Sequence, residues 1–250
     1  MQCKPKKESI IKVLANEKTH WYCTGLCDRI EKYFQLKMSG DMKMVDSLVL
    51  LAELIGTVAF AISGAMVALE KKMDIFGVIM LGVCTSVGGG YIRDLTLGIT
   101  PPAMFSNPIY TIVAAATSII VFLQVIRNFF NKEKVFYDKI LLLMDSLGLG
   151  IFVVVGVRTA YTAIPNASTF LLIYIGVLTG VGGGVLRDVL AGNTPYIFKK
   201  HFYACAALAG TVLCVALWDV AGSGIAMIAG ASTVMILRLC AAHFRWSLPR

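Results

Sequence analysis

Charged residues are scarce in this chain: Lys, Arg, Asp and Glu make up 15% of its 250 residues, whereas 57% are hydrophobic. In a soluble domain roughly a quarter of all residues are charged. The composition therefore excludes an ordinary soluble protein and predicts an integral membrane protein. The first 46 residues contain no apolar h-region, and we therefore expect no cleaved secretory signal.

The sequence also lacks the residue patterns of a metal centre or an active site. Its seven cysteines form no paired framework, and His20, Cys23 and Cys27 lack a fourth zinc ligand. No nucleophile stands with a base, and His201 and His243 adjoin basic loop ends. We therefore expect no enzyme and no cofactor. The net charge of +8 lies largely in the N-terminal segment and in loops, where it sets topology, so it predicts no nucleic-acid partner.

Seven apolar segments follow the N-terminal segment, and each is near the roughly 20 residues that a helix needs to cross a bilayer. The polar breaks between them are short, which leaves no room for a separate soluble domain. The predicted fold is all-α, with seven transmembrane helices surrounded by membrane lipid. Their expected bounds are Ser47–Leu69, Ile75–Gly98, Pro108–Phe130, Lys139–Ala160, Phe170–Gly192, Phe198–Trp218 and Gly222–Ala242.

Residues 1–46 form a polar arm of mixed charge, which we interpret as a disordered tail or an over-long start rather than a surface helix. Basic residues in short loops face the cytoplasm. This rule predicts a cytoplasmic C-terminus and an outer N-terminus, although the nine basic residues of the arm favour the reverse. Arg158 falls on the outer side, whereas the cytoplasmic side receives Lys71, Lys72, Lys132, Lys134, Lys139, Lys199, Lys200, Arg245 and Arg250.

One motif is written twice. Gly88-Gly89-Gly90-Tyr91-Ile92-Arg93-Asp94 recurs 94 positions later as Gly182-Gly183-Gly184-Val185-Leu186-Arg187-Asp188. The start of the first segment likewise matches the start of the fourth at an offset of 92. We therefore predict two three-helix repeats, 47–130 and 138–218, with a seventh helix at 222–242. Three spans per repeat invert the second relative to the first, which is typical of transport proteins with a pathway at the repeat interface.

The triple glycines, Gly88–Gly90 and Gly182–Gly184, are unfavourable within helices and cost about 1 kcal/mol each relative to Ala. One explanation is close packing of helices through small residues. Packing usually repeats a small residue at every fourth position, however, and not three in a row. The spacing therefore favours a break that exposes backbone carbonyls and amides to a polar pathway.

Charged residues inside the apolar segments are the other candidates, because each costs about 2.5–3.5 kcal/mol at membrane depth. A rise of about 1.5 Å per residue places Glu53 near Arg93 at the outer side and Asp145 near Arg187 at the inner side. We predict an ion pair in each repeat, which either holds helices together or controls the field of a pathway. Further pathway candidates are Ser63, Thr85, Ser86 and Thr179.

Arg93 and Asp94 are neighbours in sequence and should diverge by about 100° around a helix, so we do not expect them to pair. Asp94 and its counterpart Asp188 should instead attract cations or cap the half-helix that follows. The residues leave these two roles open.

The doubled Gly-Gly-Gly-x-x-Arg-Asp motif, together with Ala61-Ile62-Ser63-Gly64-Ala65 and Asp145-Ser146-Leu147-Gly148, resembles the prokaryotic trimeric intracellular cation (TRIC) channel family, which shares its domain with the UPF0126 or glycine transporter domain. The resemblance covers about Val45 to Ala242. It implies a homotrimer in a prokaryotic inner membrane, with one pore in each protomer for monovalent cations, chiefly potassium. It also implies that the second and fifth helices kink at the triple glycines and line the pore. Many relatives have Asp where this chain has Glu53, and typical members have a shorter N-terminus.

A secondary carrier for a small zwitterion such as glycine is the alternative to a channel. Half-helix N-termini at the glycines would hold a carboxylate, and Glu53 or Asp145 would hold an ammonium. Inverted repeats suit both functions, so symmetry does not decide between them. In a third reading, a non-conducting structural protein, the charges and glycines would serve packing alone.

Overall fold

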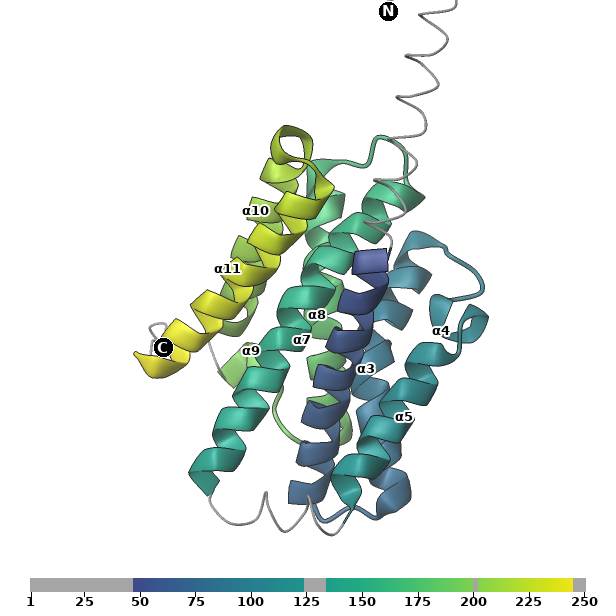
Figure 1. Cartoon of the computed structure of the whole chain (residues 1–250), viewed down its shortest axis with the longest axis vertical. Coiled ribbons are helices and arrows are strands. Elements are labelled where there is room, and N and C mark those ends of the chain that lie inside the picture. Colours follow the sequence, from purple (N-terminus) through teal and green to yellow (C-terminus); the bar gives the residue numbers. More distant parts are fainter. Residues whose placement is uncertain (1–46, 124–133, 200–201, 245–250) are drawn as a thin grey trace, which may run out of the picture. The chain divides into compact units, whose positions relative to one another are not determined.

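The computed structural model describes residues 47–123, 134–199 and 202–244, and the regular structure within these ranges is helical. The chain divides into two units, Met1–Leu48 and Val49–Arg250, and the helices of the described ranges lie in the second, except that the first of them begins at Ser47. Six helices in the described ranges are long and apolar enough to cross a membrane. They are the first helix (Ser47–Glu70), α3 (Ile75–Leu97), α7 (Lys134–Ala163), α8 (Thr169–Leu190), α10 (Phe202–Ala221) and α11 (Ser223–His243) (Figure 1).

The expected third span, Pro108–Phe130, is described as the shorter helix α5 (Ile109–Phe122), and residues 124–130 lie outside the described ranges. Two short helices were not expected from the sequence: α4 (Ala103–Ser106) and α9 (Tyr196–Lys199). Each follows the Thr-Pro pair that ends one copy of the doubled motif. The expected arm, residues 1–46, lies outside the described ranges.

The ends of α3 and α8 follow from local sequence. The Asp74 side chain accepts a hydrogen bond from Gly77 N at 2.8 Å, and the Ser168 hydroxyl accepts one from Leu171 N at 3.3 Å, so each helix has an N-cap. Gly98 and Gly192, which follow the two motif copies, have φ angles of 70° and 67°. This left-handed conformation strains other residues, and glycine is therefore required where each helix ends.

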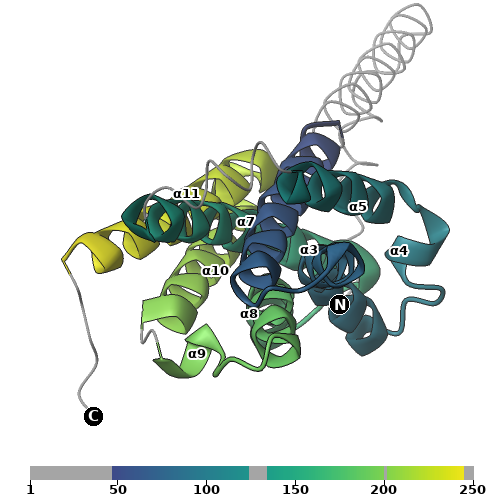
Figure 2. The same ribbon diagram turned by 90° about the horizontal axis from the view of Figure 1, so that it is seen from below.

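Helices α3 and α8 are neighbours in the bundle (Figure 2), and they meet at their triple glycines. A Cβ atom on Gly89 would overlap the carbonyl oxygen of Thr179, and a Cβ atom on Gly183 would overlap that of Thr85. A Cβ atom on Gly182 would lie 3.3 Å from the Cα of Gly89. The two backbones are thus in direct contact, as small residues permit in membrane proteins.

The first helix and α7 make equivalent contacts in the two repeats. Gly64 lies against the hydroxyl of Thr85, and Gly156, which is 92 positions later, lies against the hydroxyl of Thr179. Phe60 and Phe152, which are also 92 positions apart, stack on each other with ring centroids 5.3 Å apart. The repeat in the sequence therefore corresponds to a repeat of contacts around the α3–α8 crossing.

Helix α11 packs against α7 and α10 of the second repeat (Figure 1). A Cβ atom on Gly230 would lie 2.9 Å from the carbonyl oxygen of Gly210, and one on Gly150 would lie 2.9 Å from that of Ala231. Small residues therefore bring the seventh predicted helix close to the second repeat. This placement determines which of the two motif copies α11 reaches.

Candidate functional site: two charge clusters

The first cluster comprises Glu53, Arg93, Asp94 and Tyr110, from the first helix, α3 and α5. Both Nε and Nη2 of Arg93 lie 2.8 Å from Oδ1 of Asp94. The other oxygen of Asp94 accepts a hydrogen bond of 2.8 Å from the backbone N–H of Ala103, the first residue of α4. Glu53 accepts a hydrogen bond from the hydroxyl of Tyr110 through Oε2.

Two sequence-based predictions about this cluster are wrong. Arg93 pairs with Asp94 rather than with Glu53, and the two neighbours do face each other. The reason is the length of the arginine side chain, which spans the angle of about 100° between successive helical residues. Asp94 then occupies the guanidinium, and the Glu53 carboxylate is left for Tyr110.

A cavity of about 90 Å³ adjoins the first cluster. The hydroxyl of Ser86, a predicted pathway residue, donates to the backbone carbonyls of Thr57 at 3.0 Å and Gly82 at 2.8 Å. The cavity therefore brings together predicted charges, a predicted hydroxyl and a predicted glycine. Its lining residues are Glu53, Thr57, Ser86, Val87, Gly90, Tyr91, Arg93, Asp94, Ala103, Met104, Tyr110 and Phe152.

The second cluster comprises Asp145, Arg187, Asp188 and Arg238, and its side chains are at most 4% exposed. Arg187 Nη1 lies 2.7 Å from Asp145 Oδ1, which confirms the predicted pair. Arg187 Nε lies 2.9 Å from Asp188 Oδ1. Arg187 also donates to the hydroxyl of Ser63 in the first helix, so this predicted pathway residue links the two repeats.

Arg238 is a member of the second cluster that the sequence reasoning missed. Its Nη2 lies 2.8 Å from Asp145 Oδ2, so the two oxygens of this carboxylate bind two different arginines. The signal was present, because Arg238 is the single Asp, Glu, Lys or Arg between positions 223 and 243. A lone charge within an apolar span marks a functional position by default.

Tyrosine rings cover both arginines of the second cluster. The guanidinium of Arg187 lies 5.0 Å from the ring centroid of Tyr196, and that of Arg238 lies 4.6 Å from that of Tyr203. These distances are within the range of cation–π attraction. Tyr196 N donates to Asp188 Oδ2 at 2.8 Å, as Ala103 N does to Asp94. Both motif aspartates therefore bind the first N–H of a short helix, which fits the predicted capping role. Burial raises the pKa of the Tyr196 phenol, so this side chain is neutral.

The triple glycines do not interrupt their helices. Helix α3 runs unbroken from Ile75 to Leu97, and α8 runs unbroken from Thr169 to Leu190. The expected break is therefore wrong, and close packing accounts for five of the six glycines. A Cβ atom on the sixth, Gly90, would meet no atom closer than 3.7 Å. The hydroxyls of Thr85 and Thr179 also remain within their helices, because each donates at 2.6 Å to the carbonyl four residues earlier.

The fold and the two clusters define a class of protein. Six long apolar helices enclose ion-paired carboxylates and guanidiniums, and one cluster adjoins a cavity. Buried charges of this kind are expensive in a membrane and are kept for ion or substrate pathways. The chain is an integral membrane protein of the polytopic, α-helical transport class.

The chain matches the family described as "Glycine transporter" over residues 50–125 and 142–219. It is 35% identical over 204 residues to the UPF0126 inner membrane protein YadS of Escherichia coli K12, which covers 81% of this chain and 95% of YadS. The chain therefore belongs to the TRIC/UPF0126 family of membrane proteins and channels, which are not enzymes.

Two solved structures are similar to this chain. One was solved in work on the "Structural basis for conductance through TRIC cation channels". It is 39% identical in sequence, has a TM-score of 0.70, and the match covers 80% of this chain and 95% of the other. The other is the TRIC trimeric intracellular cation channel orthologue from Rhodobacter sphaeroides. It is 34% identical, with a TM-score of 0.73, over 80% of this chain and 100% of its own.

Proposed function

We propose that this protein is a channel for monovalent cations, chiefly potassium, with a pathway inside each protomer. The observation that carries the proposal is the first cluster. Glu53, Asp94 and Arg93 carry a net charge of about −1 and line a cavity within the apolar bundle. Low-dielectric walls strengthen the attraction of such a charge for cations. The description of similar structures as cation channels supports the same conclusion.

The proposed architecture has seven transmembrane helices, with α5 as part of the third. Repeats 47–130 and 138–218 are related by inversion, and 222–242 is the seventh helix. The equivalent contacts of Gly64 and Gly156 and the reciprocal contacts of Gly89 and Gly183 support this arrangement. In this proposal the second and fifth transmembrane helices, α3 and α8, line the pathway.

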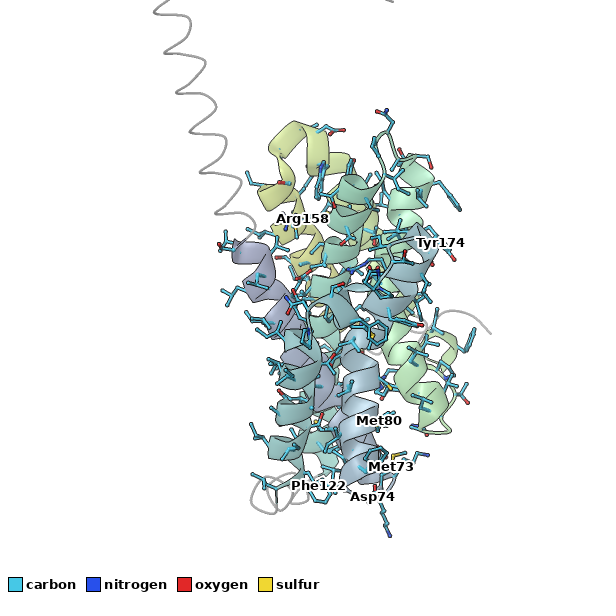
Figure 3. The ribbon with its side chains drawn as sticks, turned by 90° about the vertical axis from the view of Figure 1, so that its right-hand side faces the viewer. Met73, Asp74, Met80, Phe122, Arg158 and Tyr174 are labelled. Carbon is cyan, nitrogen blue, oxygen red and sulfur yellow. The ribbon has the colours of Figure 1, made fainter. Side chains whose placement is uncertain are left out.

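We propose a homotrimer, by analogy with the similar structure that is described as trimeric. The C-terminus would be cytoplasmic and the N-terminus outside. Figure 3 shows Met73, Asp74 and Phe122 at one end of the bundle and Arg158 toward the other. The exposed Lys71 and Lys72 precede Met73 and would mark the cytoplasmic end. The cation is cargo, and the function needs no cofactor and no nucleic acid.

A channel of this kind depends on the charge of Glu53. The substitution Glu53→Gln is expected to lower potassium conductance about tenfold, which corresponds to about 1.4 kcal/mol of lost attraction for the cation. Single-channel currents of purified protein in planar bilayers, with potassium chloride gradients, measure both conductance and reversal potential. Glu70→Gln is the matched control, because Glu70 is exposed at the far end of the same helix. Unchanged conductance in the Glu53 variant, or a chloride reversal potential, would contradict the proposal.

The carrier for a small zwitterion remains the second candidate. The specific observation in its favour is that one cavity is lined by both a carboxylate, Glu53, and a guanidinium, Arg93. These groups are complementary to the ammonium and carboxylate of an amino acid. The pairing of Arg93 with Asp94 weighs against it, because the guanidinium is already neutralised.

A further inference from the structure

The two clusters differ in net charge. In the first, Glu53 and Asp94 stand against Arg93 alone. In the second, Asp145 and Asp188 stand against both Arg187 and Arg238. The additional arginine comes from α11, which packs on the second repeat. The first cluster therefore keeps one uncompensated negative charge, and the second is neutral.

Glu53 and Asp145, which occupy matched positions of the two repeats, also differ in how many of their carboxylate oxygens have a partner. Asp145 uses one oxygen for Arg187 and the other for Arg238. Glu53 accepts through Oε2 from Tyr110, and within the described ranges its Oε1 has no hydrogen-bond partner. Tyr110 and Tyr203 are each the second residue of their helices, α5 and α10, yet the Tyr203 hydroxyl has no partner among the described residues. Arg238 thus takes the place at Asp145 that tyrosine holds at Glu53.

The cavity beside Glu53 presents acceptors and aromatic faces. The hydroxyl of Thr57 donates its proton to the backbone carbonyl of Glu53 at 2.8 Å. The hydroxyl of Ser86 donates its proton to backbone carbonyls at 2.8–3.0 Å. Both hydroxyls therefore offer lone pairs to a bound molecule. The aromatic residues Tyr91, Tyr110 and Phe152 also line the cavity. Aromatic faces attract cations and also accept methyl groups.

We propose that this cavity is a binding site for small primary ammonium ions, of which methylammonium is the simplest with an alkyl group. The N–H donors of the ammonium would meet Oε1 of Glu53 and the hydroxyl lone pairs, and the methyl group would contact the aromatic wall. The volume of about 90 Å³ is several times the ~10–15 Å³ that a cavity needs to hold one water molecule, so it has room for this ion of two heavy atoms. The site disfavours carboxylates, because Asp94 already pairs with the Arg93 guanidinium. The site deepens the proposed function, since it lies on the proposed cation pathway.

Isothermal titration of the full-length protein in detergent with methylammonium chloride tests the proposal. The expected result is saturable binding of one ion per chain, since the second cluster is neutral and closed. Glu53→Gln is expected to weaken binding at least tenfold, and Glu70→Gln is expected to leave it unchanged. Binding that persists in the Glu53 variant, or two ions per chain, would overturn the proposal. Tighter binding of glycine than of methylammonium would also overturn it.

The aromatic contribution has its own test, which does not depend on a buried residue. Tyr91 is 36% exposed, so its replacement leaves the core intact. Tyr91→Leu is expected to weaken methylammonium binding about 2- to 5-fold, as the loss of an exposed cation–π contact does, whereas Tyr91→Phe keeps the affinity. Equal affinities of the Tyr91→Leu and Tyr91→Phe variants for methylammonium would show that the aromatic ring at this position does not contribute to the site.

The binding measurement needs no ion flux, so it separates this inference from the channel itself. If potassium currents depend on Glu53 while methylammonium does not bind, the ammonium site is wrong and the channel stands. If methylammonium binds with the stated dependence on Glu53 and no potassium current is found, the site stands and the proposed channel is wrong.

Discussion

Replacement of Asp145 by Asn is expected to destabilise the folded protein by about 3–5 kcal/mol, the usual cost of breaking a buried ion pair by removing one partner. Asp145 is fully buried and binds Arg187 through one oxygen and Arg238 through the other. An amide at this position would leave two buried guanidiniums with Asp188 as their one remaining carboxylate in the second cluster. Thermal unfolding of the purified protein in detergent, followed by circular dichroism, measures the loss.

The double variant Asp145→Asn with Arg238→Met separates two causes of lost stability, the unbalanced charge and the altered side-chain shape at position 145. Removal of Arg238 restores a neutral balance between Arg187 and Asp188, so the double variant is expected to be more stable than the Asp145 variant alone. Arg238→Met by itself should cost less, because Asp145 keeps Arg187. If Asp145→Asn is as stable as Glu70→Gln, the unbalanced positive charge in the second cluster does not destabilise the folded protein.

Substitution of Gly89 or Gly183 by Ala is expected to destabilise the protein by about 1–3 kcal/mol each, as overpacking of a tight core does. Each added methyl group would overlap a backbone carbonyl of the facing helix, that of Thr179 or that of Thr85. A carbonyl within a helix cannot rotate away as a side chain can, so α3 and α8 would have to separate. Shifts in the thermal midpoint of the two variants measure this cost.

Gly224→Ala in α11 is the control for the glycine variants. A Cβ atom there meets no heavy atom within 4 Å, so the change should be neutral or slightly stabilising. If Gly89→Ala and Gly183→Ala behave like Gly224→Ala, the crossing is looser than the structure shows.

The doubled motif was enough to predict which residues share an environment, because a repeated sequence of this specificity forms repeated contacts. The same reasoning predicted the pair of Asp145 and Arg187, whose depths along neighbouring helices match. It failed at Arg93, because helical geometry gives the directions of Cβ atoms but not the conformation of a long side chain. Arg93 folds back on Asp94, and Glu53 accepts a hydrogen bond from Tyr110, which lies on a helix outside the doubled motif.

Arg238 was missed because repeat matching assigns partners within a repeat, and α11 has no counterpart there. The triple glycines were misinterpreted for a different reason. A single sequence does not show what faces a glycine. Here Gly89 lies against the carbonyl of Thr179 and the backbone of Gly182 and Gly183, so small residues on both helices allow the two backbones to touch. In the described ranges the helices α3 and α8 accordingly remain continuous.

The most direct test of the proposed channel is flux through purified protein in liposomes, with potassium efflux and labelled glycine uptake measured in parallel. We predict rapid potassium efflux that does not saturate and no uptake of glycine, and we expect Glu53→Gln to slow the efflux. Saturable, gradient-coupled uptake of glycine without a bulk potassium leak would contradict the channel and establish a carrier.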